Sequence, residues 1–290
     1  MKEFKDRIAV ITGAGSGFGR EFARLAAARG MKLALADIQQ DALDTVVAAL
    51  ADTTEILAVR LDVSDARAMD AFADRVFARF GAVHLLFNNA GVGTGGLIWE
   101  HSLADWQWVL GVNLWGVIHG IRGFVPRMIA GNDFGHIINT ASVAGLLSAQ
   151  TMGPYNVSKH GVVTLSETLF QDLRITGSKL GVTVLCPAFV DTGIKDAGRN
   201  RPEDLANTAP PTESQRLAEE QTRKAVTSGR LSAADVAART FEAIEAGQFY
   251  CLTHPRILGS VELRLADILA QRNPTDPFAL KKEVAFTAPS

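Results

Sequence analysis

Cysteine is scarce in this sequence, with only Cys186 and Cys251 among 290 residues. Two thiols cannot build a disulfide framework or a multi-thiolate zinc site, and they suit a reducing compartment. The six histidines show no spacing typical of metal ligands. We therefore expect neither disulfides nor a bound metal.

Excess charge of either sign is also missing. The chain carries 29 Lys and Arg against 31 Asp and Glu, a net charge of -2, so no basic field is available to hold a nucleic acid. Apolar runs such as residues 8–11 are far shorter than the ~20 residues that cross a bilayer. The first seven residues carry mixed charges and no secretory signal. We expect a cytoplasmic protein that binds neither nucleic acid nor membrane.

Short apolar segments alternate with segments of helical period along the chain. The expected strands cover residues 8–11, 32–36, 55–61, 84–87, 136–140, 182–186 and 249–253, and the expected helices cover 18–29, 41–50, 65–79, 103–129, 154–175 and 258–271. This alternation predicts an α/β fold with a doubly wound parallel sheet and helices on both faces. We expect one domain over residues 1–272, with a lid insertion near 193–230 and an extended tail over 273–290.

A glycine-rich turn joins the first expected strand to the first expected helix. Its residues include Gly13, Gly15, Ser16, Gly17, Phe18 and Gly19. Glycines allow the backbone to turn tightly and to approach a pyrophosphate, whose charge is favoured at a helix N-terminus. The pattern indicates a dinucleotide site, and a glycine-rich turn without a ligand is the alternative.

Asp37 ends the second expected strand, where a carboxylate can accept hydrogen bonds from the two ribose hydroxyls of a dinucleotide. The same carboxylate repels a 2′-phosphate, and Ser16 and Ile38 offer no positive charge. NAD(H) is therefore expected over NADP(H), although Arg20 and Arg60 keep NADP(H) open. A cap on the following helix is the alternative role of Asp37.

Tyrosine occurs only at positions 155 and 250, and Lys159 follows Tyr155 by four residues. At this spacing the phenol and the ammonium share one face of a helix, and the cation favours the phenolate. Ser142 ends the fifth expected strand and can present its hydroxyl to Tyr155 across a cleft. The three form a candidate catalytic group, although a lone Tyr-x-x-x-Lys is often only structural.

Together with Asn88-Asn89-Ala90-Gly91 and Asn113, these motifs resemble the single-domain short-chain dehydrogenase/reductase family over about residues 5–192. The resemblance implies a Rossmann fold with seven parallel strands in the order 3-2-1-4-5-6-7, of which residues 249–253 form the last. It implies an NAD(P)-dependent oxidoreductase acting on CH–OH groups. It also implies a homodimer or homotetramer formed through helices 103–129 and 154–175.

The resemblance implies a role for each site residue. Tyr155 would be the general acid and base on the substrate oxygen, which Ser142 would steady. Lys159 would lower the phenol pKa and hold the nicotinamide ribose, and Asn113 would anchor a water in a proton relay. The residues expected to bind the cofactor are Gly13, Gly15, Ser16, Gly17, Phe18, Gly19, Asp37, Ile38, Asp62, Val63, Asn89, Ala90, Gly91, Tyr155, Lys159, Pro187, Val190 and Thr192.

The expected substrate pocket is apolar. Its candidate residues are Val143, Met152, Ala188 and Phe189. Ala188 stands where the family usually has glycine, so it narrows the allowed backbone and adds a methyl group near the nicotinamide. A bulky hydrophobic or aromatic secondary alcohol, with its ketone, is the expected substrate. The insertion and the turn Thr253-His254-Pro255 resemble, more weakly, those of bacterial aryl-ether Cα-dehydrogenases.

Two other classes stay open. A non-catalytic dinucleotide-sensing protein would share the cleft, although such proteins tend to have lost one of the three catalytic residues. An extended sugar-nucleotide epimerase or dehydratase would share Tyr-x-x-x-Lys.

Four tryptophans lie close together at positions 99, 106, 108 and 115, and we expect them in the core or a subunit contact rather than in a substrate wall.

Overall fold

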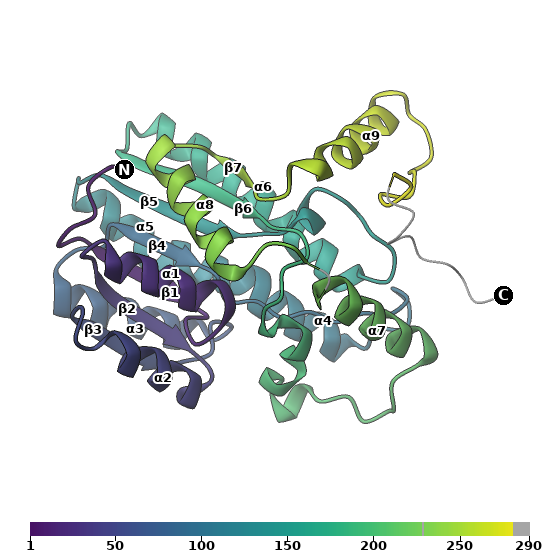
Figure 1. Ribbon diagram of the computed structural model, residues 1–290, viewed down its shortest axis with the longest axis horizontal. Coiled ribbons are helices and arrows are strands. Elements are labelled where there is room, and N and C mark those ends of the chain that lie inside the picture. The colour runs from purple at the N-terminus through teal and green to yellow at the C-terminus, as the bar shows by residue number, and fades with distance from the viewer. Residues whose placement is uncertain (228, 281–290) are drawn as a thin grey trace.

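A parallel sheet runs through the centre of the computed structural model, which describes residues 1–227 and 229–280 (Figure 1). Its strands are β1 (Ile8–Thr12), β2 (Lys32–Asp37), β3 (Ile56–Arg60), β4 (Leu85–Asn88), β5 (Gly135–Thr140), β6 (Leu180–Cys186) and β7 (Tyr250–Leu252). They lie in the order β3-β2-β1-β4-β5-β6-β7, and all six neighbouring pairs are parallel. The predicted doubly wound sheet and its strand order are confirmed.

Helices cover both faces of this sheet (Figure 1). They are α1 (Gly17–Ala28), α2 (Gln40–Leu50), α3 (Ala66–Phe80), α4 (Leu103–Leu110), α5 (Gly116–Ala130), α6 (Gly153–Ile175), α7 (Glu213–Thr227), α8 (Ala233–Ala246) and α9 (Leu258–Leu269). Phe22 of α1 and Phe241 of α8 belong to one apolar core, and Phe72 of α3 and Phe124 of α5 belong to a second. Alternate residues of β1 enter the two cores, so the strand is buried along its whole length.

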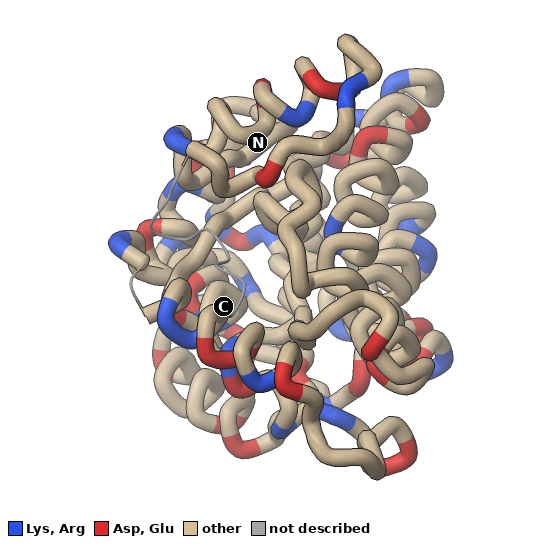
Figure 2. Tube along the Cα trace, turned by 90° about the vertical axis from the view of Figure 1, so that its right-hand side faces the viewer, with Lys and Arg blue, Asp and Glu red and all other residues tan. Residues whose placement is uncertain are grey.

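Charged residues of both signs are interspersed along the outer helices (Figure 2). Ion pairs join neighbouring helices, as where Arg127 of α5 meets Asp74 of α3 at 2.5 Å and Arg122 meets Asp70 at 3.7 Å. These pairs are largely exposed, so each contributes about 1 kcal/mol or less. The mixture agrees with the net charge of -2 and with the absence of a basic field in the sequence.

The helix predicted over residues 103–129 is interrupted by a π-helical turn. Helix α4 ends at Leu110, residues Gly111–Trp115 form the π turn, and α5 continues to Ala130. By length and mean hydropathy, 1.2, the stretch Leu103–Ala130 could cross a membrane, but half of its most apolar window is buried inside the protein. A core helix packed on a sheet passes the same test. Because π turns occur often at functional sites, this interruption draws attention to Asn113 within it.

The predicted insertion lies beside the C-terminal ends of the strands. It contains 3-10 turns at Gly193–Asn200 and Glu203–Leu205, followed by α7. Helix α9 projects from the body of the protein (Figure 1). Of the predicted tail, residues 273–280 are described and 281–290 lie outside the described residues. The single domain over 1–272 stays a prediction.

Candidate active site

A cleft of about 650 Å³ opens at the C-terminal ends of the strands. Parallel α/β sheets bind ligands at this edge, where the strand order reverses. The expected site residues that line the cleft are Gly13, Ser16, Gly17, Phe18, Asp37, Ile38, Asp62, Val63, Asn89, Ala90, Gly91, Ser142, Val143, Met152, Tyr155, Lys159, Pro187, Ala188, Phe189, Val190 and Thr192. Gly15, Gly19 and Asn113 are not among the lining residues. The fold thus brings together residues that are far apart in the sequence.

The glycine turn between β1 and α1 depends on the missing side chains. Gly13 and Gly17 have φ of +65° and +50°, in the left-handed region that favours glycine. A Cβ atom on Gly13 would lie 2.9 Å from the Cα of Ala90. On Gly19 it would lie 2.0 Å from the carbonyl oxygen of Gly13. The turn therefore packs against the loop after β4 and the start of α1 as closely as backbone can.

Asp37 holds the turn to the end of β2. Its Oδ2 accepts a hydrogen bond from the Gly15 amide at 2.8 Å, and its Oδ1 accepts one from the Gln39 amide at 2.9 Å. Each carboxylate oxygen keeps further acceptor capacity. Helix α2 begins at Gln40 with Gln39 as its N-cap residue, so Asp37 does not cap the helix. The carboxylate is placed to accept ribose hydroxyls.

A hydrogen-bonded network around Asn89, which the family resemblance places beside the central strand, joins the ends of three strands. The Thr12 hydroxyl accepts from the amides of Asn89 at 2.9 Å and Ala90 at 3.2 Å. The Asn89 side chain donates to the Thr12 carbonyl at 3.0 Å and accepts from the Thr140 hydroxyl at 3.2 Å. This network fixes β1, β4 and β5 relative to one another at the floor of the cleft. The sequence signals for it are the motif Asn88-Asn89-Ala90-Gly91 and a threonine at the last position of β1 and of β5.

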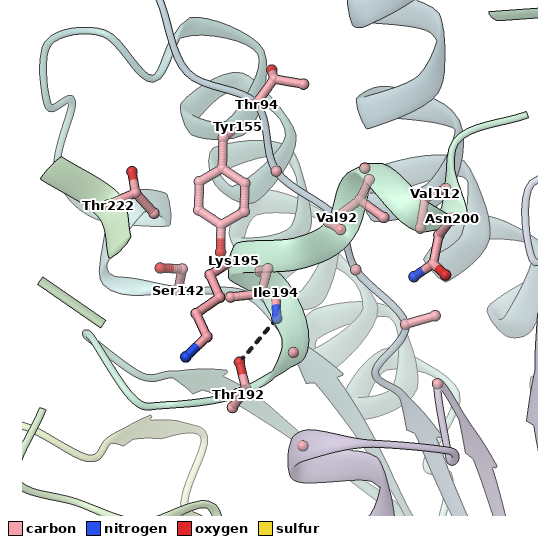
Figure 3. A pocket seen from close by; sticks show the side chains of 18 of the residues that line it. Val92, Thr94, Val112, Ser142, Tyr155, Thr192, Ile194, Lys195, Asn200 and Thr222 are labelled. Carbon is pink, nitrogen blue, oxygen red and sulfur yellow. Dashed lines mark hydrogen bonds between the residues drawn. The ribbon is translucent and has the colours of Figure 1, made fainter. Parts of the chain in front are cut away.

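Ser142, Tyr155 and Lys159 meet in the cleft. Pro154 lies in the first turn of α6, where its missing amide is no loss, and Tyr155 follows it. The Tyr155 hydroxyl points toward Ser142 (Figure 3), and Ser142 affects the pKa of the phenol. The Lys159 Nζ lies 5.6 Å from the Tyr155 ring centroid and donates to the Thr140 carbonyl at 2.9 Å. The predicted convergence of the three groups is present in the structure.

Burial dominates the electrostatics of this group. Burial raises the pKa of Tyr155, and the hydrogen bond with Ser142 opposes the rise. Burial also lowers the pKa of Lys159 to about 8. Within the chain the desolvation of Tyr155 is the largest effect on its pKa, and the predicted lowering by Lys159 together with an oxidised nicotinamide stays a prediction.

Asn113 lies behind Tyr155, fully buried in the π turn. Its side chain accepts from the Val92 amide at 2.8 Å and donates to the Val92 carbonyl at 2.9 Å and the Ser158 hydroxyl at 3.1 Å. The Ser158 hydroxyl in turn donates to the Tyr155 carbonyl at 2.7 Å. These bonds tie the helix α4–α5 and the loop after β4 to the first turn of α6. The side chain therefore positions Tyr155, and the predicted water relay stays a prediction.

Ala188 occupies its position without backbone strain. Its φ lies outside the left-handed region, and its amide donates to Nδ1 of His254 at 3.2 Å. The replacement of the usual glycine therefore adds a methyl group to the cleft wall without distorting the chain.

Nearby Cys186 is fully buried, and burial raises its thiol pKa to about 12, so it does not act as a nucleophile. Within residues 1–227 and 229–280, no group of three His, Cys, Asp or Glu residues is placed to hold a metal ion.

The cleft is also lined by residues that the sequence did not single out as pocket residues. Trp108 is buried and lines the cleft, with the Arg201 guanidinium 5.1 Å from its ring centroid. Arg201 also forms a 2.6 Å ion pair with buried Asp105 at the start of α4. Trp108 thus belongs both to the core and to the cleft wall, whereas Trp99 is exposed. Phe278, near the end of the described chain, lines the cleft as well.

Comparisons with known proteins agree with this site. Residues 7–203 match the model of the short chain dehydrogenase family. The chain is 33% identical over 278 residues to the CLA biosynthesis dehydrogenase/reductase of Lactiplantibacillus plantarum, covering 94% of this chain and 97% of that protein. It is 40% identical over 205 residues to the C alpha-dehydrogenase of Sphingobium sp., covering 70% and 66%. A crystal structure of a short chain dehydrogenase/reductase from Burkholderia phymatum in complex with NAD is 58% identical, with a TM-score of 0.94 over 96% of this chain and 99% of that one.

The chain therefore belongs to the short-chain dehydrogenase/reductase family, and the resemblance seen in its motifs is confirmed. Its relatives are named dehydrogenases and oxidoreductases, so the class of protein is an oxidoreductase of CH–OH groups.

Proposed function

We propose that the protein is an NAD(H)-dependent oxidoreductase that interconverts a bulky hydrophobic or aromatic secondary alcohol and its ketone, with Tyr155 exchanging the proton. One observation carries the proposal. Ser142, Tyr155 and Lys159 meet in the same cleft as the glycine turn and Asp37. A sensing protein would need the dinucleotide site but not a phenol directed at a hydroxyl inside it.

The residues around the glycine turn fit a dinucleotide. The turn brings backbone close to the cleft, and Asp37 keeps acceptor capacity toward ribose hydroxyls. A cleft of about 650 Å³ lies within the usual range for ligand sites, roughly 300–1,000 Å³. The carboxylate disfavours a 2′-phosphate, and Arg20, one of the two arginines that could offset it, pairs with Glu21. The relative from Burkholderia phymatum, in complex with NAD, supports the same choice.

The chemistry assigned to the chain is proton transfer. When bound, a nicotinamide cofactor supplies the hydride acceptor or donor. The Tyr155 phenolate takes the alcohol proton during oxidation, and the phenol returns a proton to the carbonyl oxygen during reduction. Ser142 donates a hydrogen bond to that oxygen. Because burial raises the pKa of Tyr155, oxidation near neutral pH needs positive charge beside the phenol, from Lys159 and the oxidised nicotinamide together.

The substrate class follows from the cleft wall. Val143, Met152, Phe189 and Leu147 supply apolar surface in the same cleft as Tyr155. Such a wall favours a large apolar group next to the alcohol carbon over a hydrophilic one. The likeness to the C alpha-dehydrogenase of Sphingobium supports an aryl substituent there. Assembly into a homodimer or homotetramer and a cytoplasmic location remain predictions.

The proposal is tested by following absorbance of the reduced nicotinamide against a library of alcohols and ketones, with NAD(H) and NADP(H) in parallel. We expect turnover of aryl or bulky cyclic secondary alcohols with NAD as the preferred cofactor. Turnover restricted to small hydrophilic alcohols would contradict the substrate class. A higher kcat/KM with NADP would contradict the cofactor choice, and NAD binding without any turnover would favour the sensing protein.

A further inference from the structure

We propose that Arg199, in the insertion after β6, binds the diphosphate of the dinucleotide from the side opposite the glycine turn. The inference rests on the proposed function, because it takes the cleft as a dinucleotide site. It adds a residue that lies outside the sequence motifs. The argument comes from the position of the side chain, from the charges of the cleft and from the chemistry of guanidinium.

The 3-10 turn Gly193–Asn200 folds back toward the glycine turn. A Cβ atom on Gly17 would lie 3.1 Å from the Cβ of Thr192, so the two segments are in contact at that point. A Cβ atom on Gly193 would lie 2.8 Å from Nη2 of Arg199 and 3.5 Å from the hydroxyl oxygen of Ser16. The guanidinium and the glycine turn thus flank the same small region of the cleft. Arg199 lines that cleft.

Hydrogen bonds hold the guanidinium at this place. Its Nη1 donates to the carbonyls of Gly193 at 3.3 Å and Asp196 at 3.2 Å. Both bonds come from one nitrogen, so Nη2 and Nε are left to donate elsewhere. The next residue, Asn200, accepts from the Gln39 side chain at 2.8 Å, close to the Asp37 end of β2. The segment therefore runs from the centre of the cleft to its adenosine end.

Among the basic residues of the cleft that lie outside the catalytic group, Arg199 is the one for which the described residues show no acidic partner. The basic residues that line the cleft are Lys159, Lys195, Arg199 and Arg201. Lys195 pairs with Asp191 at 2.9 Å and Arg201 pairs with Asp105 at 2.6 Å. Lys159 belongs to the catalytic group. In residues 1–227 and 229–280 no ion pair involves Arg199, so its charge is available to a ligand.

A diphosphate bound at the glycine turn needs such a charge. It carries two negative charges, whereas residues 12–19 contribute only backbone amides and hydroxyl or apolar side chains. Arg20, which follows them, pairs with Glu21 at 3.3 Å. A guanidinium offers a planar pair of donors that matches two phosphate oxygens. A 2′-phosphate would instead have to lie beside the Asp37 carboxylate, so the diphosphate is the better partner for Arg199.

The test measures binding rather than turnover. Dissociation constants of NAD, ADP and adenosine are determined by calorimetry for the wild type, Arg199→Ala, Arg199→Lys and the control Arg216→Ala. Arg216 lies on α7 in the same insertion but does not line the cleft. We expect Arg199→Ala to weaken NAD and ADP by about tenfold, as for loss of a charge-assisted hydrogen bond at a partly exposed site. Adenosine binding should stay unchanged, Arg199→Lys should be intermediate, and Arg216→Ala should match the wild type.

Each other outcome is informative. Unchanged ADP binding in Arg199→Ala, with NAD still bound by the wild type, would overturn the role of Arg199 and leave the proposed function intact. Equal weakening of adenosine and ADP would show that the residue only supports the fold of the cleft. A wild type that binds neither NAD nor ADP would refute the proposed function itself.

Discussion

The buried ammonium of Lys159 destabilises the folded protein, so a substitution that removes it should raise the free energy of unfolding. The side chain is 2% exposed, and burial lowers its pKa from 10.5 to about 8. At 1.36 kcal/mol per pH unit, the charged form at neutral pH is disfavoured by about 3 kcal/mol relative to the unfolded chain. Because the folded pKa is the lower one, the unfolded state binds more protons between pH 8 and 10.5. The free energy of unfolding of the wild type should therefore rise as pH increases from 8 to 10.5. Below pH 8 the destabilisation by the buried ammonium should be present in full.

Lys159→Met removes the titrating group while keeping most of the apolar stem. We expect the variant to be more stable than the wild type at pH 7 by about 2 kcal/mol, since about 1 kcal/mol of the gain is lost with the hydrogen bond to Thr140. The difference should fall by about 2.5 kcal/mol between pH 7 and pH 10, so that at pH 10 the variant is no more stable than the wild type. Urea unfolding at several pH values measures both quantities. Exposed Lys179→Met serves as the control and should follow the wild type at every pH. If the free energy of unfolding varied with pH in the same way in the wild type and in Lys159→Met, the claim that Lys159 is buried as a charged ammonium would be refuted.

Three further substitutions test other parts of the site. Asp37→Ser removes the charge that disfavours a 2′-phosphate, so the NAD-to-NADP ratio of kcat/KM should fall by about tenfold or more, and an unchanged ratio would contradict that role. Asn113→Ala leaves the buried Val92 amide and carbonyl without partners, and urea unfolding should show a loss of about 2–4 kcal/mol, whereas no measurable loss would disprove the positioning role. Arg201→Ala removes a hydrogen bond to Asp105. Burial raises the pKa of this carboxyl, but its hydrogen bonds, that from Arg201 foremost, lower it below the unfolded value of 3.8. The ionised carboxyl therefore stabilises the fold above pH 3.8, and this stabilisation is lost as pH falls through the lower folded pKa. The variant should lose about 2–4 kcal/mol at pH 7 and less below pH 3.8, and an equal loss at both would argue against the ion pair.

Local patterns account for what could be predicted from the sequence. Fully apolar strands such as β1 reveal a sheet covered on both faces, and the glycine turn marks where β1 passes into α1. The spacing of Tyr155 and Lys159 places both on one helix face by geometry alone. Strand ends were predicted to within one or two residues, because the apolar run continues slightly past or short of the hydrogen-bonded segment.

Contacts between distant segments account for what could not be predicted. The π turn at Asn113 lies in a helix whose apolar period gives no sign of interruption. The Asp105–Arg201 pair joins residues 96 positions apart, and nothing in either neighbourhood indicates the other. The same applies to Arg199, whose approach to Ser16 depends on how the insertion folds back.

The central claim is that Tyr155 transfers the proton in a cleft that binds NAD independently of it. Steady-state kcat/KM and the NAD dissociation constant should be measured together for the wild type, Tyr155→Phe and Tyr250→Phe. Tyr250 is the only other tyrosine, and its hydroxyl donates to Glu167 at 2.6 Å on the surface. We expect Tyr155→Phe to lose about a thousandfold in kcat/KM while NAD binding changes by less than about twofold, and Tyr250→Phe to behave as the wild type. Wild-type turnover by Tyr155→Phe, with an unaltered pH profile, would contradict the account.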